Sequence, residues 1–273
     1  METFQLSEEL LKKIADLILA KKNTPLKKIV KDVHFADMAE IINELNEDQG
    51  IYLIKLFDSE KTSEILTELN EDVREKILKA LSVKEIADAF EELDSDDAAD
   101  ILGELSEKRK EEVISEISDN NLADDLKELL SYKEDSAGGL MAKELVHANE
   151  NWSITKCLNE IKKQGENVTR VHSIYVVDNK QKLIGRLSLK DLIISPAKNL
   201  IKDIYIPKVD SVNVYEDGEE VAKIMSKYDL EAIPVVDNNK KLVGRITIDD
   251  IKDFIKEEAE EDYLLAAGVQ GDV

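Results

Sequence analysis

Acidic side chains gather at two places in this chain, with a spacing that suits cation binding. Eight of the seventeen residues from Ile246 to Asp262 are acidic, and the stretch EELDSDDAAD from Glu91 to Asp100 is also rich in acids. On a helix, carboxylates at i and i+4 such as Asp96 and Asp100 lie one above the other and repel each other by roughly a few tenths of a kcal/mol. Carboxylate oxygens are ligands of Mg²⁺ and Ca²⁺, so a bound divalent cation would offset this repulsion. A solvated helix face explains any single acid without a ligand.

The composition narrows the classes of partner. The chain has 273 residues with 37 basic and 60 acidic side chains, which give a formal net charge of −23. This charge disfavours nucleic acid and anionic membrane surfaces, because both would repel it. It favours cations or basic partners, or simply solubility. No apolar run reaches the roughly 18 residues that a membrane-spanning helix needs, and the polar N-terminus is not a secretory signal, so we expect a soluble chain.

The sequence gives little support for an enzyme. Cys157 is the single cysteine, which leaves no internal disulfide and points to a reducing compartment. We find no Cys/His zinc spacing, no P-loop and no Ser/His/Asp set. The three histidines, His34, His147 and His172, are scattered along the chain.

A strict twelve-residue period governs the elements that would carry the first group of acids. At each step an apolar residue precedes Asn, Asp or Ser, the residue types preferred as helix N-caps. The pairs are Leu45-Asn46, Phe57-Asp58, Leu69-Asn70, Leu81-Ser82, Leu93-Asp94, Leu105-Ser106 and Ile117-Ser118. Each unit predicts a helix of about two turns, too short to be stable alone, so successive units must stack. Two units form a helical hairpin, which predicts an all-α solenoid with a repeat of 24 residues.

The predicted stack buries one apolar face of each unit. The positions that we expect in its core are Ile65, Leu66, Ile77, Leu78, Ile86, Ala89, Ile101, Leu102, Val113 and Ile114. Two amphipathic helices near Glu8–Ala20 and Leu26–Val33 are predicted to cover its start.

The second half of the chain contains a tandem duplication. Residues 173–193 align without gaps to residues 232–252, with ten identities in 21 positions. Each copy predicts a β-hairpin followed by a helix, and a further amphipathic helix precedes each hairpin, at Ile154–Lys163 and Glu219–Tyr228. Ser188 and Thr247 are predicted N-caps, each with an aspartate three residues later, a carboxylate variant of the capping box.

This duplicated pattern resembles a CBS domain pair. The family's G-x-x-[ST]-x-x-D signature stands here as GRLSLKD (185–191) and GRITIDD (244–250). The resemblance implies a β-sheet with packed helices in each copy, and a pair that commonly forms homodimers. In many CBS pairs this signature holds an adenine nucleotide, which would assign nucleotide contacts to Ser188, Asp191 and Thr247, with ATP as a possible ligand. Helix capping explains the same residues without a ligand.

The order of all these parts resembles the cytosolic region of MgtE-type magnesium transporters or channels. The acidic solenoid is followed by the glycine-containing joint YKEDSAGGLM (132–141), the CBS pair and the sequence EEAEEDYLLAAGV (257–269). The fold expected is therefore α+β and multidomain. Its predicted parts are a solenoid at 1–131, the joint with the first CBS domain at 132–200, the second CBS domain at 201–262, and the start of a connecting helix at 263–273.

The resemblance also implies a ligand set for regulatory Mg²⁺. It places the ion between acids of the solenoid and acids of the CBS pair and its last helix. Carried over to this sequence, the metal-ligand candidates are Glu64, Asp96, Asp100, Asp217, Glu219, Asp229, Asp250, Asp253, Glu258, Glu261 and Asp262.

The resemblance predicts a Mg²⁺-sensing regulatory region at the cytoplasmic face of the cell membrane. Its expected partners are a second copy, through the CBS domains, and a transmembrane domain of the same protein that this sequence does not contain. Two other functions stay open: a CBS module that senses adenine nucleotides, and an acidic scaffold for a basic partner. A catalytic role is not expected.

Overall fold

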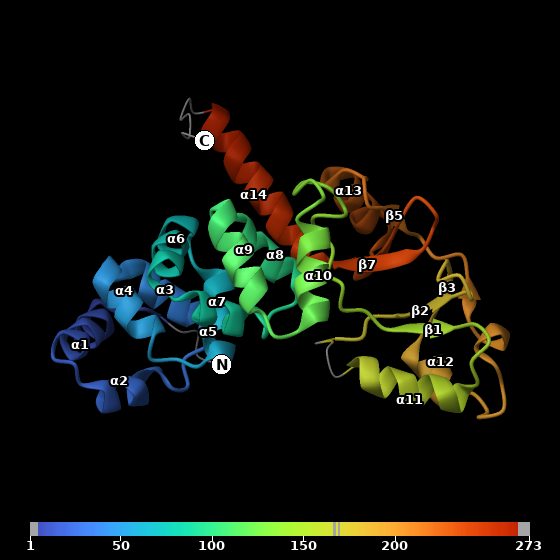
Figure 1. Ribbon diagram of the computed structural model, residues 1–273, viewed down its shortest axis with the longest axis horizontal. Coiled ribbons are helices and arrows are strands. Elements are labelled where there is room, and N and C mark those ends of the chain that lie inside the picture. The colour runs from blue at the N-terminus through green and yellow to red at the C-terminus, as the bar shows by residue number, and fades with distance from the viewer. Residues whose placement is uncertain (1–4, 166–167, 169, 267–273) are drawn as a thin grey trace. The chain divides into compact units, whose positions relative to one another are not determined.

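The computed structural model describes residues 5–165, 168 and 170–266 (Figure 1). The chain divides into two compact units, Met1–Leu126 and Lys127–Val273, and each is considered by itself. Among the described residues, no helix is both long and apolar enough to span a membrane.

The first unit is a stack of short helices, as the twelve-residue period predicts. Its helices are α1 (Glu8–Leu19), α2 (Asn23–Val30), α3 (Phe35–Glu44), α4 (Glu47–Ile54), α5 (Ser59–Glu68), α6 (Glu71–Ala80), α7 (Val83–Phe90), α8 (Ser95–Gly103) and α9 (Glu107–Glu116), and α10 (Asn120–Leu129) crosses the boundary between the units. From α3 onward, helices pack on the helix two places along the chain, as in α3 on α5, α5 on α7 and α7 on α9. This packing confirms the repeat of helical hairpins.

The helix starts follow the predicted N-caps, with one exception. Asn46 and Ser82 form complete capping boxes, and the Asp58 carboxylate accepts a hydrogen bond of 3.0 Å from the Lys61 amide. The prediction of a helix directly after Ser118 is wrong: α10 begins at Asn120. Among the apolar positions predicted to be buried, all are buried except Ile114, which is partly exposed.

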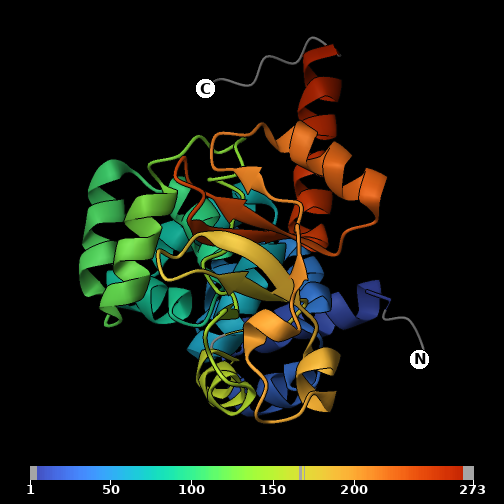
Figure 2. The same cartoon turned by 90° about the vertical axis from the view of Figure 1, so that its right-hand side faces the viewer.

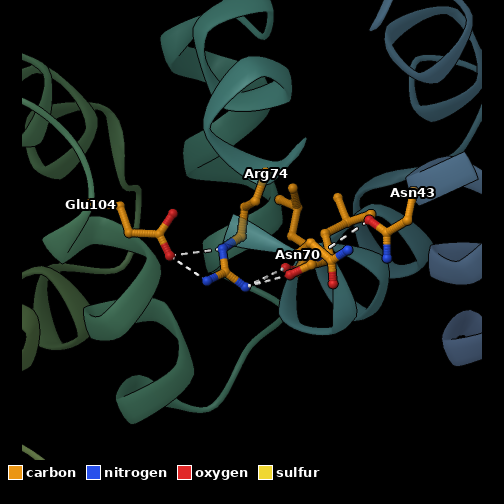
Figure 3. A network of polar contacts seen from close by, with 6 residues as sticks. Asn43, Asn70, Arg74 and Glu104 are labelled. Atoms are coloured by element: carbon orange, nitrogen blue, oxygen red, sulfur yellow. Dashed lines mark hydrogen bonds and ion pairs between the residues drawn. The ribbon is translucent and has the colours of Figure 1, made fainter. Parts of the chain in front are cut away.

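Arg74 stabilises the stack at the C-terminal end of a neighbouring helix (Figure 3). Its Nη1 donates to the carbonyl oxygens of Leu66 and Leu69 at 3.3 and 3.1 Å, and its Nε donates to Glu104 at 2.8 Å. These carbonyls close α5, where the last C=O groups of a helix have no partner within the helix. Arg74 therefore satisfies orphan carbonyls of α5 and is paired with an acid of the next repeat.

Other basic side chains of the first unit bind backbone carbonyls in the same way. The contacts are Lys61 Nζ to Val30 at 2.9 Å and to Val33 at 3.1 Å, Arg109 Nη2 to Leu81 at 2.6 Å, and Lys55 Nζ to Ala80 at 2.8 Å. These cations cap helix ends, where they complement the negative end of the helix dipole. Lys55, Lys61 and Arg109, like Arg74, are thus held at helix ends.

The second unit contains two small sheets and their covering helices (Figure 2). One sheet has the order β1 (His147–Asn149), β2 (Ile174–Val177), β3 (Leu183–Leu187), β4 (Ile206–Pro207), and the other β5 (Val212–Asn213), β6 (Ala232–Val236), β7 (Leu242–Thr247). The helices are α11 (Ile154–Gln164), α12 (Leu189–Ile194), α13 (Gly218–Tyr228) and α14 (Ile248–Ala266), with a 3₁₀ turn at Ile201–Asp203.

The two copies repeat each other in detail. In both, a parallel pair precedes an antiparallel hairpin, and both hairpins carry a bulge at equivalent valines, Val176/Val177 and Val235/Val236. The hairpin tips bond to each other, since the Leu183 amide donates to the Lys240 carbonyl at 3.0 Å and the Leu242 amide donates to the Gln181 carbonyl at 3.1 Å. The tandem pair thus folds as one body with approximate twofold symmetry.

The glycine-containing joint is built into the second copy, which its sequence does not predict. The amides of Ala137 and Gly138 each donate at 2.8 Å to carbonyls of the loop after β5, and Ala142 exchanges two backbone hydrogen bonds with Arg245 of β7. Ala137, Met141 and Ala142 are fully buried. The segment that leaves the solenoid is therefore fixed to the second CBS copy, although the first copy is the next one along the chain.

Candidate functional site

The first two turns of α14 carry three acids, Asp249, Asp250 and Asp253, at or next to the CBS signature. The Thr247 amide and hydroxyl both donate to Asp250 Oδ2, at 2.7 and 2.8 Å, so Asp250 caps the helix and its position is fixed. Asp253 follows one turn later. Partial burial raises the pKa of Asp253, and the carboxylates of Asp250 and Asp249 raise it further, against the opposing charge of Lys256. The folded state thus favours the protonated form of Asp253 more than the unfolded chain does.

The N-terminus of α13 places two more predicted ligands beside α14. Asp217 caps α13, accepting a hydrogen bond of 3.0 Å from the Glu219 amide. Between them lies Gly218, where a Cβ atom would stand only 2.7 Å from Cζ of Phe254 in α14. Figures 1 and 2 show α13 beside α14. Asp217 and Glu219 therefore lie where α13 meets α14, near the turn that carries Asp253.

Asp229 does not join this group. It lies at the other end of α13, which spans eleven residues, or about 16 Å at 1.5 Å per residue. Its backbone has the left-handed conformation, φ 53°, and its amide donates to the Met225 carbonyl as a C-cap. Asp tolerates this conformation better than most residues do, so a structural role explains Asp229.

The remaining candidates differ in burial. Asp96 is 7% exposed at the start of α8 and accepts a 3.0 Å hydrogen bond from the Asp97 amide, whereas Asp100, one turn later, is exposed. Glu64 is exposed on α5. In α14, Glu258 is partly buried, and the side chains of Glu261 and Asp262 lie outside the described residues. The predicted part 263–273 continues α14 as far as Ala266, and 267–273 lies outside the described residues.

The described acids of the second unit do not form a closed cage. Among the described residues of that unit alone, no three Asp, Glu, His or Cys side chains bring ligand atoms within 4.8 Å of one another. Mg²⁺ keeps several waters and is held by one or two carboxylates, so an open acidic face at the α13–α14 contact suits a hydrated ion better than Zn²⁺.

Replacing Asp253 tests whether its surroundings disfavour a negative charge at this position. Because the folded-state pKa of Asp253 lies above its ordinary value of 3.8, the folded state binds more protons, and stability falls as pH rises from that value through the folded-state pKa. In EDTA at pH 7, we expect Asp253→Asn to be more stable than the parent, with the difference vanishing below about pH 3. Urea unfolding against pH measures this.

Asp178 provides a matched control, because its pKa is shifted in the opposite direction. Backbone hydrogen bonds from Lys182 and Lys180 lower the pKa of Asp178, so Asp178 stabilises the fold above its ordinary pKa. Asp178→Asn should be less stable than the parent at pH 7. Equal effects of the two substitutions would contradict the assignment at Asp253.

The nucleotide-contact candidates are engaged in helix capping. Ser188 Oγ accepts from the Asp191 amide at 3.0 Å and donates to the Asp191 carboxylate at 2.7 Å, and Thr247 bonds Asp250 in the equivalent place. In both copies the predicted N-cap is therefore hydrogen-bonded to the aspartate three residues later.

A polar cavity between the two copies was not predicted from the sequence. It is lined in part by Arg170, His172, Tyr175 and Arg245. Within the part of the chain that the structure describes, the buried Nδ1 of His172 and the buried hydroxyl of Tyr175 have no hydrogen-bond partner, although the Nδ1 lies 3.6 Å from the Glu231 carboxylate. Burial raises the pKa of Tyr175 to about 12. The cavity volume is about 10 Å³, room for at most one water, whereas sites for drug-sized ligands occupy hundreds of Å³.

Comparison with known proteins places the chain in a family. Residues 33–135 match the family model of the MgtE intracellular N domain, and residues 137–197 and 201–257 match that of the CBS domain. A crystal structure of the cytosolic domain of the Mg²⁺ channel MgtE in complex with ATP superimposes with a TM-score of 0.82 at 30% identity, covering 89% of this chain and 99% of that one. The chain belongs to the MgtE family.

Further relatives agree with this membership. The soluble part of a magnesium transporter matches with a TM-score of 0.77 at 28% identity, covering 92% of this chain and 99% of that one. Among whole MgtE magnesium transporters, that of Thermus thermophilus is 41% identical over 131 residues, 48% of this chain and 29% of the relative. That of Enterococcus faecalis is 39% identical over 140 residues, 51% of this chain and 31% of the relative. The aligned segment thus spans about a third of these relatives, and the chain corresponds to the cytosolic region of MgtE.

Proposed function

We propose that this chain is the Mg²⁺-sensing regulatory region of a magnesium transporter. The observation that carries the proposal is the packing of α13 on α14, two helices whose first turns carry predicted ligands: Asp217 and Glu219 at the start of α13, and Asp250 and Asp253, whose pKa is raised, in α14. Membership of the MgtE family supports Mg²⁺ as the cation.

The proposed mechanism is electrostatic. Without Mg²⁺, the acidic faces of the solenoid and of the CBS pair repel each other over a Debye length of about 8 Å at physiological salt. Mg²⁺ ions held by carboxylates of both units, with Glu64, Asp96 and Asp100 as solenoid candidates, favour a compact state. The ion shifts the population only by its greater affinity for that state, so several weak sites acting together give a steep response.

In the whole protein, the compact state closes the ion pathway. α14 is the last described element and carries part of the acidic face, so it is the element proposed to transmit the change. A homodimer formed through the CBS domains would place two such helices at the cytoplasmic face of the membrane.

Nucleotide binding is a second candidate function. It is supported by a structural relative that is described in complex with ATP, and by the two G-x-x-[ST]-x-x-D motifs. The buried Nδ1 of His172 and hydroxyl of Tyr175 beside two arginines offer polar groups for an anion. Such binding requires the cavity to open, because its volume of about 10 Å³ admits no nucleotide.

Isothermal titration calorimetry with Mg²⁺ and with ATP, each alone and then together, separates the candidates. The proposal predicts Mg²⁺ binding in the millimolar range without nucleotide. ATP binding in EDTA with no heat from Mg²⁺ would favour the nucleotide sensor. Absence of both responses would favour an acidic scaffold for a basic partner.

A further inference from the structure

One contact point joins three segments that are far apart in the sequence of the second unit. A Cβ at Gly218 would lie 2.7 Å from Phe254 Cζ and 2.9 Å from Leu140 Cδ1. Leu140 belongs to the joint that follows the solenoid, Gly218 begins α13, and Phe254 belongs to α14. Atoms of real side chains do not approach a Cβ this closely, so only glycine permits the arrangement.

The joint is held rigidly on its side of this point. The Gly218 amide donates to the Asp135 carbonyl at 2.8 Å, and the Ala137 amide donates to the Glu216 carbonyl at 2.8 Å. Ser136 pairs with Asp217 in an antiparallel bridge and is 7% exposed. A displacement of the joint would therefore move the loop after β5 and Asp217, the residue that caps the start of α13.

The other side of the point belongs to the acidic helix. Phe254 is 8% exposed and lies next to Asp253 in the sequence, one turn after Asp250. Asp217 and Glu219 flank Gly218. The same contact thus sets the spacing of the α13 acids from the α14 acids and links both to the joint.

We propose that Gly218 is a positioning residue that couples the joint at 132–141 to α14 through Leu140 and Phe254. The inference rests on the proposed Mg²⁺ response. When the solenoid moves on Mg²⁺ binding, the joint transmits the movement to α14 at this point, because both are packed against the same residue. Packed interfaces of this kind switch between discrete arrangements more readily than they deform continuously.

Gly218→Ala tests the coupling, since its methyl group must push Phe254 or Leu140 away. Hydrogen exchange of the α14 peptide 251–266, with Mg²⁺ and with EDTA, reports the response of the helix. In the parent chain we expect Mg²⁺ to slow exchange by about threefold or more. In the variant this protection should be lost. In Leu140→Ala, which leaves Gly218 and its flanking acids unchanged, Mg²⁺ binding by calorimetry should persist while the protection is lost.

Controls keep the outcomes distinct. Gly165→Ala adds a methyl group where no atom of the described residues lies within 4 Å, so it should behave as the parent. Leu140→Ala removes the contact without introducing a clash and should also uncouple α14. It therefore tests the coupling even if Gly218→Ala does not fold. If both contact variants keep the parent's Mg²⁺ protection, the coupling is refuted while the sensor stands. If the parent itself neither binds Mg²⁺ nor changes its exchange, the proposed function falls, and the coupling with it.

Discussion

Replacing Asp250 and Asp253 together by asparagine is expected to raise the Mg²⁺ concentration at half-response by roughly tenfold or more, the effect of losing about 1.4 kcal/mol of ion binding. Both acids lie in the first turns of α14, and asparagine keeps an oxygen acceptor that can bond the Thr247 amide in place of Asp250 Oδ2. The helix cap should therefore survive while the charge that holds the ion is lost. Calorimetry with Mg²⁺ measures the shift.

A matched variant changes the net charge equally at another place. Glu160→Gln combined with Asp210→Asn removes two acids from α11 and from the loop between β4 and β5. If charge at the α13–α14 face matters, this control should shift the midpoint far less. Equal shifts in both double variants would mean that Mg²⁺ only screens the net charge of −23.

Replacing Arg74 by alanine is expected to destabilise the solenoid by about 2 kcal/mol or more, because a single hydrogen bond to a charged group contributes about 1.5–3 kcal/mol. Its guanidinium binds the carbonyls of Leu66 and Leu69 and the carboxylate of Glu104, and the Arg74 side chain is 14% exposed. Stacked repeats share stability with their neighbours, so the loss should extend beyond α6. Urea unfolding followed by far-UV circular dichroism measures it.

Lys79→Ala is the matched control on the same helix. Lys79 pairs with Glu75 at the surface, with side-chain exposures of 68% and 56%. Exposed pairs contribute about 0–1 kcal/mol, so the control should stay close to the parent. Similar losses for the two variants would show that the carbonyl contacts of Arg74 carry no special weight.

Much of the fold was predictable because local rules and repetition agree. The twelve-residue period combined an N-cap with buried apolar positions, and the helix pairs follow it from Asn46 to Ser106. Ser118 failed as a helix start because Asp119 holds the Asn121 amide at 2.8 Å and takes over the cap. One-residue shifts of this kind depend on which of several neighbouring polar side chains accepts the hydrogen bond from the free amide at the helix start.

The site was less predictable because its geometry depends on long-range contacts. The sequence indicates acids near the signature of the second copy, but only the fold shows that Gly218 brings Asp217 and Glu219 to α14. The docking of the joint on the second copy has no local signal, since its glycines are also compatible with a loose linker. The cavity that buries the Nδ1 of His172 and the hydroxyl of Tyr175 likewise has no local signal, because Arg245 of the second copy helps to line it.

Small-angle X-ray scattering of this chain in Mg²⁺ and in EDTA tests the central claim most directly. The claim is that divalent cations offset repulsion between two acidic units, so millimolar Mg²⁺ should reduce the radius of gyration and EDTA should restore it. NaCl at the same ionic strength should give a much smaller change, because screening alone does not bridge carboxylates. A radius of gyration that is the same in Mg²⁺ and in EDTA would contradict the account.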